Sequence, residues 1–141
     1  LLTGTPDELL RLPNGWLHIL DYKTARYTEG QDDLLPMYRT QLNAYALNAE
    51  KLDMGKVVGL ALMYFEPQTD IKAEGVDGVV KKDGFDLRFQ ATVVKIDLDL
   101  QTIPTLLKEA RRIFDLPKPP EGRAGCRDCQ LVERMTNLLS A

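Results

Sequence analysis

The stretch DELLRLPNGWLHILDYK, residues 7–23, contains two short apolar runs on either side of a turn. The turn is Pro13-Asn14-Gly15. Proline suits the second position of a type I turn, and glycine tolerates the left-handed conformation that follows it. A two-residue Asn-Gly turn would pair Pro13 with Trp16, whereas a three-residue loop would pair Leu12 with Trp16. We favour the three-residue loop, and the stretch therefore predicts an antiparallel hairpin with a defined register.

The three-residue loop places two acids opposite each other. In that register Leu9 faces Ile19 and Asp7 faces Asp21, and directly opposed residues have Cβ atoms about 4.5–5.5 Å apart. Carboxylates at that distance repel unless a cation lies between them, and Mg²⁺ prefers a few carboxylate oxygens plus water. Lys23 follows Asp21 by two residues and so points to the same face. The hairpin predicts a metal site at the two acids, with the lysine able to orient or deprotonate an attacking water.

The alternative for these residues is a surface ion pair, because Asp-x-Lys is a common spacing. Asp70-Ile71-Lys72 has the same spacing. That second copy follows Pro67 in a predicted loop and has no acid placed opposite it, so it is the weaker candidate.

Apolar periodicity and turn residues predict the other elements. Residues 56–66, KVVGLALMYFE, form a continuous apolar run that is typical of a strand buried on both faces. Farther along, alternation places every second residue from Phe85 to Val93 on one face of a strand. In chain order the expected elements are strands over 1–12 and 16–23, a helix over 35–51, strands over 56–66 and 85–97, a helix that begins near Asp99 or Thr102, and a short C-terminal helix. This order predicts an α/β (α+β) domain with a mixed central sheet flanked by helices.

Composition narrows the possible functions. The chain has 141 residues, enough for one domain with its own core. Its net charge of −3 argues against a protein that holds nucleic acid by net positive charge, although a bound metal can reach phosphates instead. No apolar run approaches the ~20 residues of a membrane span and no signal peptide pattern is present, so we expect a cytoplasmic protein without a membrane partner. The chain begins with Leu1 inside an expected strand, and we therefore expect an upstream segment.

Three short motifs resemble those of a known family. Gly4-Thr5-Pro6-Asp7, Asp21-Tyr22-Lys23 and Gln41-Leu42-Asn43-Ala44-Tyr45 are similar, in that order, to the G-x-x-D, (D/E)-x-K and Q-x-x-x-Y motifs of RecB-like nucleases in the PD-(D/E)XK superfamily. Gly30 to Asp33 also matches the first motif alone, but all three in order over about 40 residues are far more specific. The relatives include CRISPR-associated and AddB-type exonucleases. The resemblance covers the first half of the chain, and the second half only in architecture.

The resemblance implies a nuclease core over residues 1–116, from which the family's N-terminal helix is missing. It implies a metal-dependent DNA nuclease, an exonuclease, that hydrolyses phosphodiester bonds by metal-activated water with Mg²⁺ or Mn²⁺ as cofactor. Gln41 and Tyr45, four residues apart on one helix face, would orient the lysine and contact the DNA backbone. The implied catalytic residues are Asp7, Asp21 and Lys23, and the implied metal ligands are Asp7, Asp21 and the backbone carbonyl of Tyr22.

Cys126-Arg127-Asp128-Cys129 follows a Pro-rich connector, and we expect residues 117–141 to pack on the same domain. Many relatives bind an iron–sulfur cluster through a C-terminal C-x2-C-x5-C pattern, but Met135 stands where the last cysteine would be. Two thiolates cannot complete a four-ligand iron–sulfur or zinc site alone. We therefore expect reduced free thiols, left from a degenerate cluster motif, and no cluster in this chain. A local disulfide and a bound metal are the alternatives.

The expected partner is DNA, either single-stranded or with free ends. A helicase, other repair or CRISPR-associated proteins and a second copy of the chain are further candidate partners. One alternative function is a catalytically inactive DNA-binding or structural domain that keeps the nuclease fold. Another is a protein-interaction module whose C-terminal CRDC segment binds a metal. An assay for metal-dependent cleavage separates the first alternative from a nuclease, and elemental analysis addresses the second.

Overall fold

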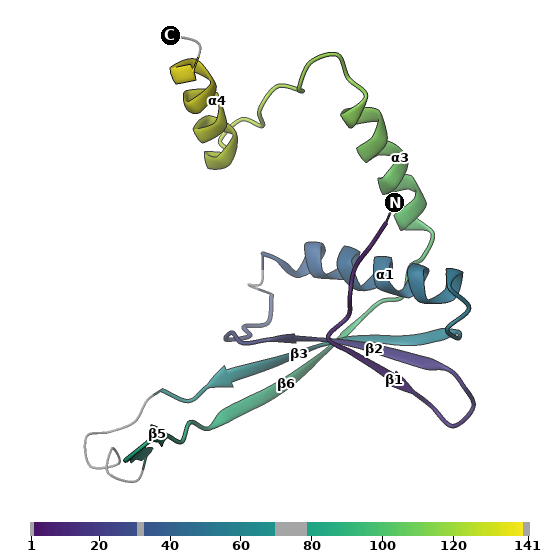
Figure 1. Ribbon diagram of the computed structural model, residues 1–141, viewed down its shortest axis with the longest axis vertical. Helices are drawn as coiled ribbons and strands as arrows, with labels where there is room; N and C mark the ends of the chain where they lie inside the picture. The colour runs from purple at the N-terminus through teal and green to yellow at the C-terminus, as the bar shows by residue number, and fades with distance from the viewer. Residues whose placement is uncertain (1, 31–32, 70–78, 140–141) are drawn as a thin grey trace. The chain divides into compact units, whose positions relative to one another are not determined.

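The structure of the protein is a computed structural model that describes residues 2–30, 33–69 and 79–139. The chain divides into two compact units, Leu1–Ile103 and Pro104–Ala141, and each is described by itself. Within the described residues, the first unit contains a four-stranded sheet, a small two-stranded ladder and a helix, and the second unit is helical (Figure 1). The predicted α/β (α+β) class is confirmed.

The four-stranded sheet is mixed, as predicted. Its strands are β1 (Glu8–Arg11), β2 (Leu17–Lys23), β3 (Val57–Pro67) and β6 (Phe89–Ile96), in the order β1-β2-β3-β6. β2 and β3 are parallel, and the other neighbours are antiparallel. Helix α1 (Leu35–Lys51) is the crossover that parallel pairing requires, and it lies along one face of the sheet (Figure 1).

The turn between β1 and β2 has the predicted three-residue loop. Leu12 N donates to Trp16 O at 2.8 Å, and Gly15 N donates to Leu12 O at 2.9 Å. Gly15 has a φ of 84°, in the left-handed region that favours glycine. Leu9 pairs with Ile19, so the predicted register of the hairpin is confirmed.

β1 is shorter than the strand expected over residues 1–12, because ladder pairing begins only at Glu8. Pro6 has no N–H to donate to a ladder, and Gly4 loses more backbone entropy in a strand than other residues do. The segment before Glu8 therefore leaves the ladder, and Asp7 lies just outside it.

β3 is buried on one face and only partly on the other. Leu60, Leu62 and Tyr64 are no more than 4% exposed and belong to the core. The alternate residues Met63 and Phe65 are half-buried. The expected burial on both faces is therefore wrong for the described part of this unit, because α1 covers a single face of the sheet.

The strand expected over residues 85–97 is two elements. Gly84–Phe85 forms β5, which pairs with β4 (Val80–Lys81) in the small ladder, and β6 begins only at Phe89. Along β6 the predicted apolar face is the exposed one, since Phe89 and Val93 are about half exposed, at 49% and 56%. The other face, which includes Ile96, packs against the core.

The core lies between α1 and the sheet. Fully burying a leucine side chain stabilises a fold by about 1.5–3 kcal/mol, so the several buried leucines dominate the packing energy. The buried cluster comprises Leu17, Ile19, Leu42, Ala46, Ala49, Val57, Leu60, Leu62, Tyr64 and Ile96.

Asn43 joins α1 to the segment that follows β6. It is 2% exposed, and its Nδ2 donates to the carbonyls of Arg39 and Asp97 at 2.9 and 3.0 Å. Its Oδ1 accepts a hydrogen bond from Asp99 N at 2.6 Å. Because both ends of the amide are paired, this polar side chain is tolerated in the interior.

Helix α3 (Thr102–Phe114) begins at the end of the first unit. Asp99 Oδ1 accepts hydrogen bonds from Gln101 N at 3.2 Å and Thr102 N at 3.3 Å. Of the two candidate caps, Asp99 therefore satisfies the free N–H groups of the first turn. Asp99 also accepts a hydrogen bond from the Thr102 side chain. This bond, more than the two from the backbone, holds the pKa of Asp99 below its ordinary value.

Helix α4 (Arg127–Leu139) lies in the second unit, directly after Cys126. Both helices expected in the C-terminal part of the chain are therefore present. The packing of residues 117–141 on residues 1–116 stays a prediction. None of the helices in the described ranges is long and apolar enough to cross a membrane.

Candidate active site

The C-terminal end of β2 carries an acid and a lysine on the face that packs under α1. Leu17, Ile19 and Asp21 alternate along the strand and are all buried, with Asp21 only 3% exposed. Lys23 continues the same face, as the period of two predicts, and its side chain is 19% exposed. A carboxylate is costly to bury without a partner, so its contacts decide whether it has a function.

Asp21 is held from two sides. Its Oδ2 forms an ion pair with Lys23 Nζ, and its Oδ1 accepts a hydrogen bond from Gln41 Nε2 at 3.3 Å. The buried Oδ2 lies close to the ammonium but has no hydrogen-bond partner of good geometry among the described residues. The ammonium attracts that oxygen by charge but leaves it without a directed hydrogen bond, so the oxygen can accept another electropositive ligand.

Gln41 and Tyr45 form the next layer of the site. Gln41 Nε2 also contacts the Tyr45 hydroxyl at 2.8 Å, so the two residues act as one unit on the face of α1 above β2. The structure brings Gln41 to the carboxylate of Asp21 rather than to Lys23. Its effect on the lysine therefore passes through the acid.

Tyr38 is a site residue that the motifs did not identify. Lys23 Nζ lies 4.0 Å from the centroid of the Tyr38 ring, a cation–π distance. Tyr38 precedes Gln41 by three residues and Tyr45 by seven, the spacing of one helix face. That helical spacing was not used to assign Tyr38, although it places Tyr38 on the same face of α1 as Gln41.

Asp7 lies beside this group but contacts it differently from the expectation. Continuing the ladder past Glu8, which pairs with Leu20, places Asp7 opposite Asp21. Asp7 is exposed, however, and its Oδ2 accepts a hydrogen bond from Tyr22 N at 2.7 Å. Its carboxylate is therefore fixed at the edge of β2, next to the backbone of the residue between Asp21 and Lys23.

Gly4 connects the first motif to the third. A Cβ built on Gly4 would overlap the ring of Tyr45, with Cδ1 at 3.0 Å and a second ring carbon closer still. The absence of a side chain at Gly4 lets the N-terminal segment lie directly on this ring. Residues from all three motifs therefore meet on one side of the sheet.

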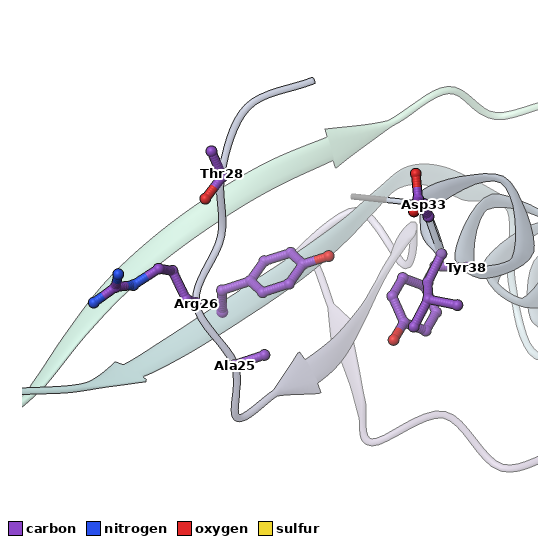
Figure 2. Close-up of a pocket in the computed structure, with 7 residues that line it drawn as sticks. Ala25, Arg26, Thr28, Asp33 and Tyr38 are labelled. Atoms are coloured by element: carbon purple, nitrogen blue, oxygen red, sulfur yellow. The ribbon is translucent and has the colours of Figure 1, made fainter. Parts of the chain in front are cut away.

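A pocket of about 340 Å³ opens beside the loop that follows β2. Figure 2 shows Ala25, Arg26 and Thr28 along the loop that follows β2, with Asp33 and Tyr38 across from them. Tyr38 thus contacts Lys23 and also lines the pocket. Arg26 adds a positive charge at this rim, where its Nε pairs with Glu66 Oε1 at 2.6 Å. The full lining is Ala25, Arg26, Thr28, Asp33, Leu34, Tyr38 and Tyr64.

The donor atoms at this end of β2 fit a hard divalent cation. Mg²⁺ binds through one or two carboxylates and keeps several waters. Asp7 and Asp21 offer two carboxylates, because the register continued past Glu8 places these residues opposite each other. The buried Oδ2 of Asp21, which lacks a hydrogen bond, is the atom that such an ion would satisfy. Over the described residues, no group of three His, Cys, Asp or Glu side chains is placed to hold a metal. A metal here would therefore depend on two acids, a backbone oxygen and water.

The remaining sequence candidates are the two cysteines and the second Asp-x-Lys copy. Cys126 and Cys129 are free thiols in the second unit. Asp70-Ile71-Lys72, the second Asp-x-Lys copy, falls outside the residues that the structure describes.

Comparisons with known proteins identify the family. Neither the curated proteins nor the solved structures that were searched gave a match. A family model of the PD-(D/E)XK nuclease superfamily matches residues 1–134, which is nearly the whole chain. That superfamily indicates a nuclease with DNA as the substrate, and its members generally use divalent metal ions. The chain belongs to the PD-(D/E)XK nuclease superfamily.

Proposed function

We propose that this protein is a Mg²⁺- or Mn²⁺-dependent deoxyribonuclease of the RecB-like type, and that it acts as an exonuclease. Membership of the superfamily supports the coarser part of this proposal, a nuclease that acts on DNA. The single observation that carries the proposed metal dependence is the buried Asp21 carboxylate, held between Lys23 Nζ and Gln41 Nε2. A nuclease needs an acid and a cation beside the scissile phosphate, and this arrangement supplies both.

Asp21, Asp7 and the Tyr22 carbonyl are the proposed metal ligands. The N–H of Tyr22 points to Asp7, and a residue in an antiparallel pair directs its N–H and C=O to the same side. The Tyr22 carbonyl is therefore expected to face the side on which Asp7 lies. When bound, the ion would activate a water and offset negative charge on the phosphate oxygens.

Lys23 is the proposed partner of the attacking water. Its ammonium is fixed between the Asp21 carboxylate and the Tyr38 ring, so few rotamers remain open to it. From that position the ammonium can donate hydrogen bonds to a water or to a phosphate oxygen in the transition state. Gln41 keeps Asp21 in place, and Tyr45 keeps Gln41 in place.

The pocket beside Tyr38 is the proposed place for the nucleotide next to the scissile phosphate. Aromatic rings stack on bases without regard to sequence, and the half-buried ring of Tyr38 lines the pocket. Arg26, whose Nε is paired with Glu66 Oε1 at 2.6 Å, lines the same pocket. This arrangement suits a nuclease that does not read sequence.

A catalytically inactive DNA-binding domain is the alternative that we retain. The intact Asp21–Lys23 pair argues against it, because burying a charged pair without a function brings little stability. A helicase or other repair or CRISPR-associated partner, a second copy of the chain and a cytoplasmic location belong to the same proposal, and they rest on the sequence alone.

A cleavage assay tests the proposal. Linear DNA and covalently closed circular DNA are incubated with the protein in Mn²⁺, and products are followed over time. Degradation of the linear DNA alone supports an exonuclease, whereas cutting of the circle would make the protein an endonuclease. DNA binding without cleavage of either substrate would favour the inactive alternative.

The Lys23→Ala variant tests the assignment of the catalytic lysine. Removal of a group that acts mainly in the transition state typically costs about 10²–10³ in rate, while metal and DNA binding are retained. Lys95→Ala, at an exposed position of β6, is the matched control and should cleave at the parental rate. Parental cleavage by Lys23→Ala would remove Lys23 from the mechanism.

A further inference from the structure

Cys126 occupies the N-cap position of α4. Its carbonyl accepts a hydrogen bond from Gln130 N at 3.1 Å, the first bond of the helix, and its own N–H donates to Arg123 O at 3.0 Å. Gly125, with a φ of 76°, turns the chain sharply just before it. Cys129 is then the third residue of the helix, so both sulfurs lie at the same helix end.

The sulfur of Cys126 takes the place that a serine or aspartate oxygen has in an ordinary N-cap. At the N-cap, a side chain faces the free backbone N–H groups of the first turn of the helix. The backbone N–H of Cys129, then its thiol, and the N–H of Asp128 hold the pKa of the Cys126 thiol below its ordinary value. Burial and the Asp128 carboxylate act in the opposite direction but do not outweigh them. Cys126 is therefore the better nucleophile of the pair.

Cys129 is held close to Cys126 by the loop that precedes the helix. A Cβ built on Gly122 would lie 2.8 Å from Cys129 Cβ and 3.6 Å from its sulfur, so only glycine lets the loop come so close. Both thiols are free and half-buried. A small molecule can therefore reach the sulfurs, which the N-cap and the third helical position hold at the same end of the helix.

We propose that Cys126 and Cys129 form a redox-active dithiol that small-molecule disulfides convert reversibly to an intrachain disulfide. The Cys126 thiolate attacks one sulfur of the small disulfide, whose S–S bond breaks and releases one thiolate. A mixed disulfide on Cys126 results. Cys129 then gives up its proton and attacks the Cys126 sulfur, which forms the intrachain bond and releases the second thiolate. The two cysteines are oxidised, and one small disulfide is reduced to two thiols.

This site does not depend on the proposed nuclease activity, because every contact that carries it lies within residues 122–130. It also differs from a metal site. Two cysteines alone do not complete a zinc or iron–sulfur centre, whereas two neighbouring thiols are sufficient for a disulfide. The dithiol is thus complete in the residues that the second unit itself supplies.

Glutathione buffers of graded ratio test the proposal on the whole chain. The reduced protein is equilibrated in these buffers, and the remaining free thiols are blocked with a maleimide. The mass of the intact protein is then measured by mass spectrometry. The expected result is that both thiols are lost together, with a mass decrease of two hydrogen atoms and no glutathione adduct. Two free thiols at every glutathione ratio would overturn the proposal, as would iron or zinc bound to these cysteines in the purified protein.

Single variants test which of the two cysteines attacks the small disulfide first. In Cys129→Ser the serine keeps a donor to Cys126, and this variant should stop at a glutathione adduct on Cys126. Near pH 7 it should react with iodoacetamide faster than Cys126→Ser, because the thiolate is the reactive form. The excess should shrink at high pH, where any thiol is largely thiolate. Equal rates for the two variants near pH 7 would contradict the role given to Cys126.

Discussion

The Gln41 side chain donates a hydrogen bond to Asp21 Oδ1 at 3.3 Å, and this contact joins the helix motif to the strand motif. One oxygen of the acid is thereby occupied from the helix side. The other, Oδ2, is left to the ammonium of Lys23. The two contacts together orient the Asp21 carboxylate. A proposed metal ligand needs supporting residues that fix its orientation in this way.

Gln41→Ala should lower the cleavage rate about 10- to 100-fold, the usual cost of removing the residue that orients a metal ligand. The fold should remain, because Gln41 is only partly buried. The rate is measured at saturating Mn²⁺ and DNA. Thr40→Ala, an exposed neighbour on the same helix, should cleave like the parent. Equal rates for Gln41→Ala and the parent would separate Gln41 from the site.

Tyr38→Leu should reduce the cleavage rate, because Lys23 loses the ring that lies 4.0 Å from its Nζ. A cation–π contact contributes about 0.5–2 kcal/mol, so a reduction of about 2- to 30-fold is expected. Tyr38→Phe keeps the ring and should keep most of the activity. If Tyr38→Phe is as slow as Tyr38→Leu, the hydroxyl rather than the ring is what matters.

Gly4→Ala should both destabilise the protein and slow cleavage. The added methyl group overlaps the Tyr45 ring, and such overpacking costs about 1–3 kcal/mol. The ring can move only by disturbing the contact between its hydroxyl and Gln41. Gly84→Ala is the control, because a Cβ there meets nothing within 4 Å. Thermal melts that are unchanged for both variants would show that the N-terminal segment does not lie on this ring.

Asn43→Ala should destabilise the fold by about 2–4 kcal/mol, because three backbone groups lose the hydrogen-bond partner that the buried amide supplies. The groups are the carbonyls of Arg39 and Asp97 and the N–H of Asp99. Asn48→Ala, on the same helix, loses a single hydrogen bond of 3.4 Å and should cost far less. Urea unfolding midpoints measure both. Similar midpoints for the two variants would contradict the role of Asn43.

The hairpin and its polar end were predictable from local rules. Pro13 and Gly15 have narrow backbone preferences, which set the loop length and hence the register that pairs Leu9 with Ile19. Once β2 was recognised as a strand, the period of two placed Asp21 and Lys23 on one face.

The contacts that the sequence did not predict are those between distant segments. Tyr38 meets Lys23 because the first turn of α1 packs over the end of β2, and no local pattern contains that packing. Asp7 binds Tyr22 N because the ladder stops at Glu8, which leaves its carboxylate free to turn to the strand edge.

The apolar faces of β6 were ambiguous for a similar reason. Val93 and Ile96 lie on opposite faces of the strand, and both are apolar. Only the position of α1 decides that Ile96 enters the core while Val93 stays 56% exposed. Alternation alone gives the period of a strand, but the core face depends on what covers the sheet.

The most direct test of the proposed metal centre is a calorimetric titration with Mn²⁺ of the parent protein, Asp21→Asn and Lys23→Ala. Asn has nearly the shape of Asp but lacks its charge, so loss of binding reports on the carboxylate itself. The expected result is that Asp21→Asn loses the binding heat, while Lys23→Ala binds as well as the parent or slightly better, because a positive charge beside Oδ2 has gone. Binding of Mn²⁺ by Asp21→Asn with parental affinity would contradict a metal centre at the end of β2.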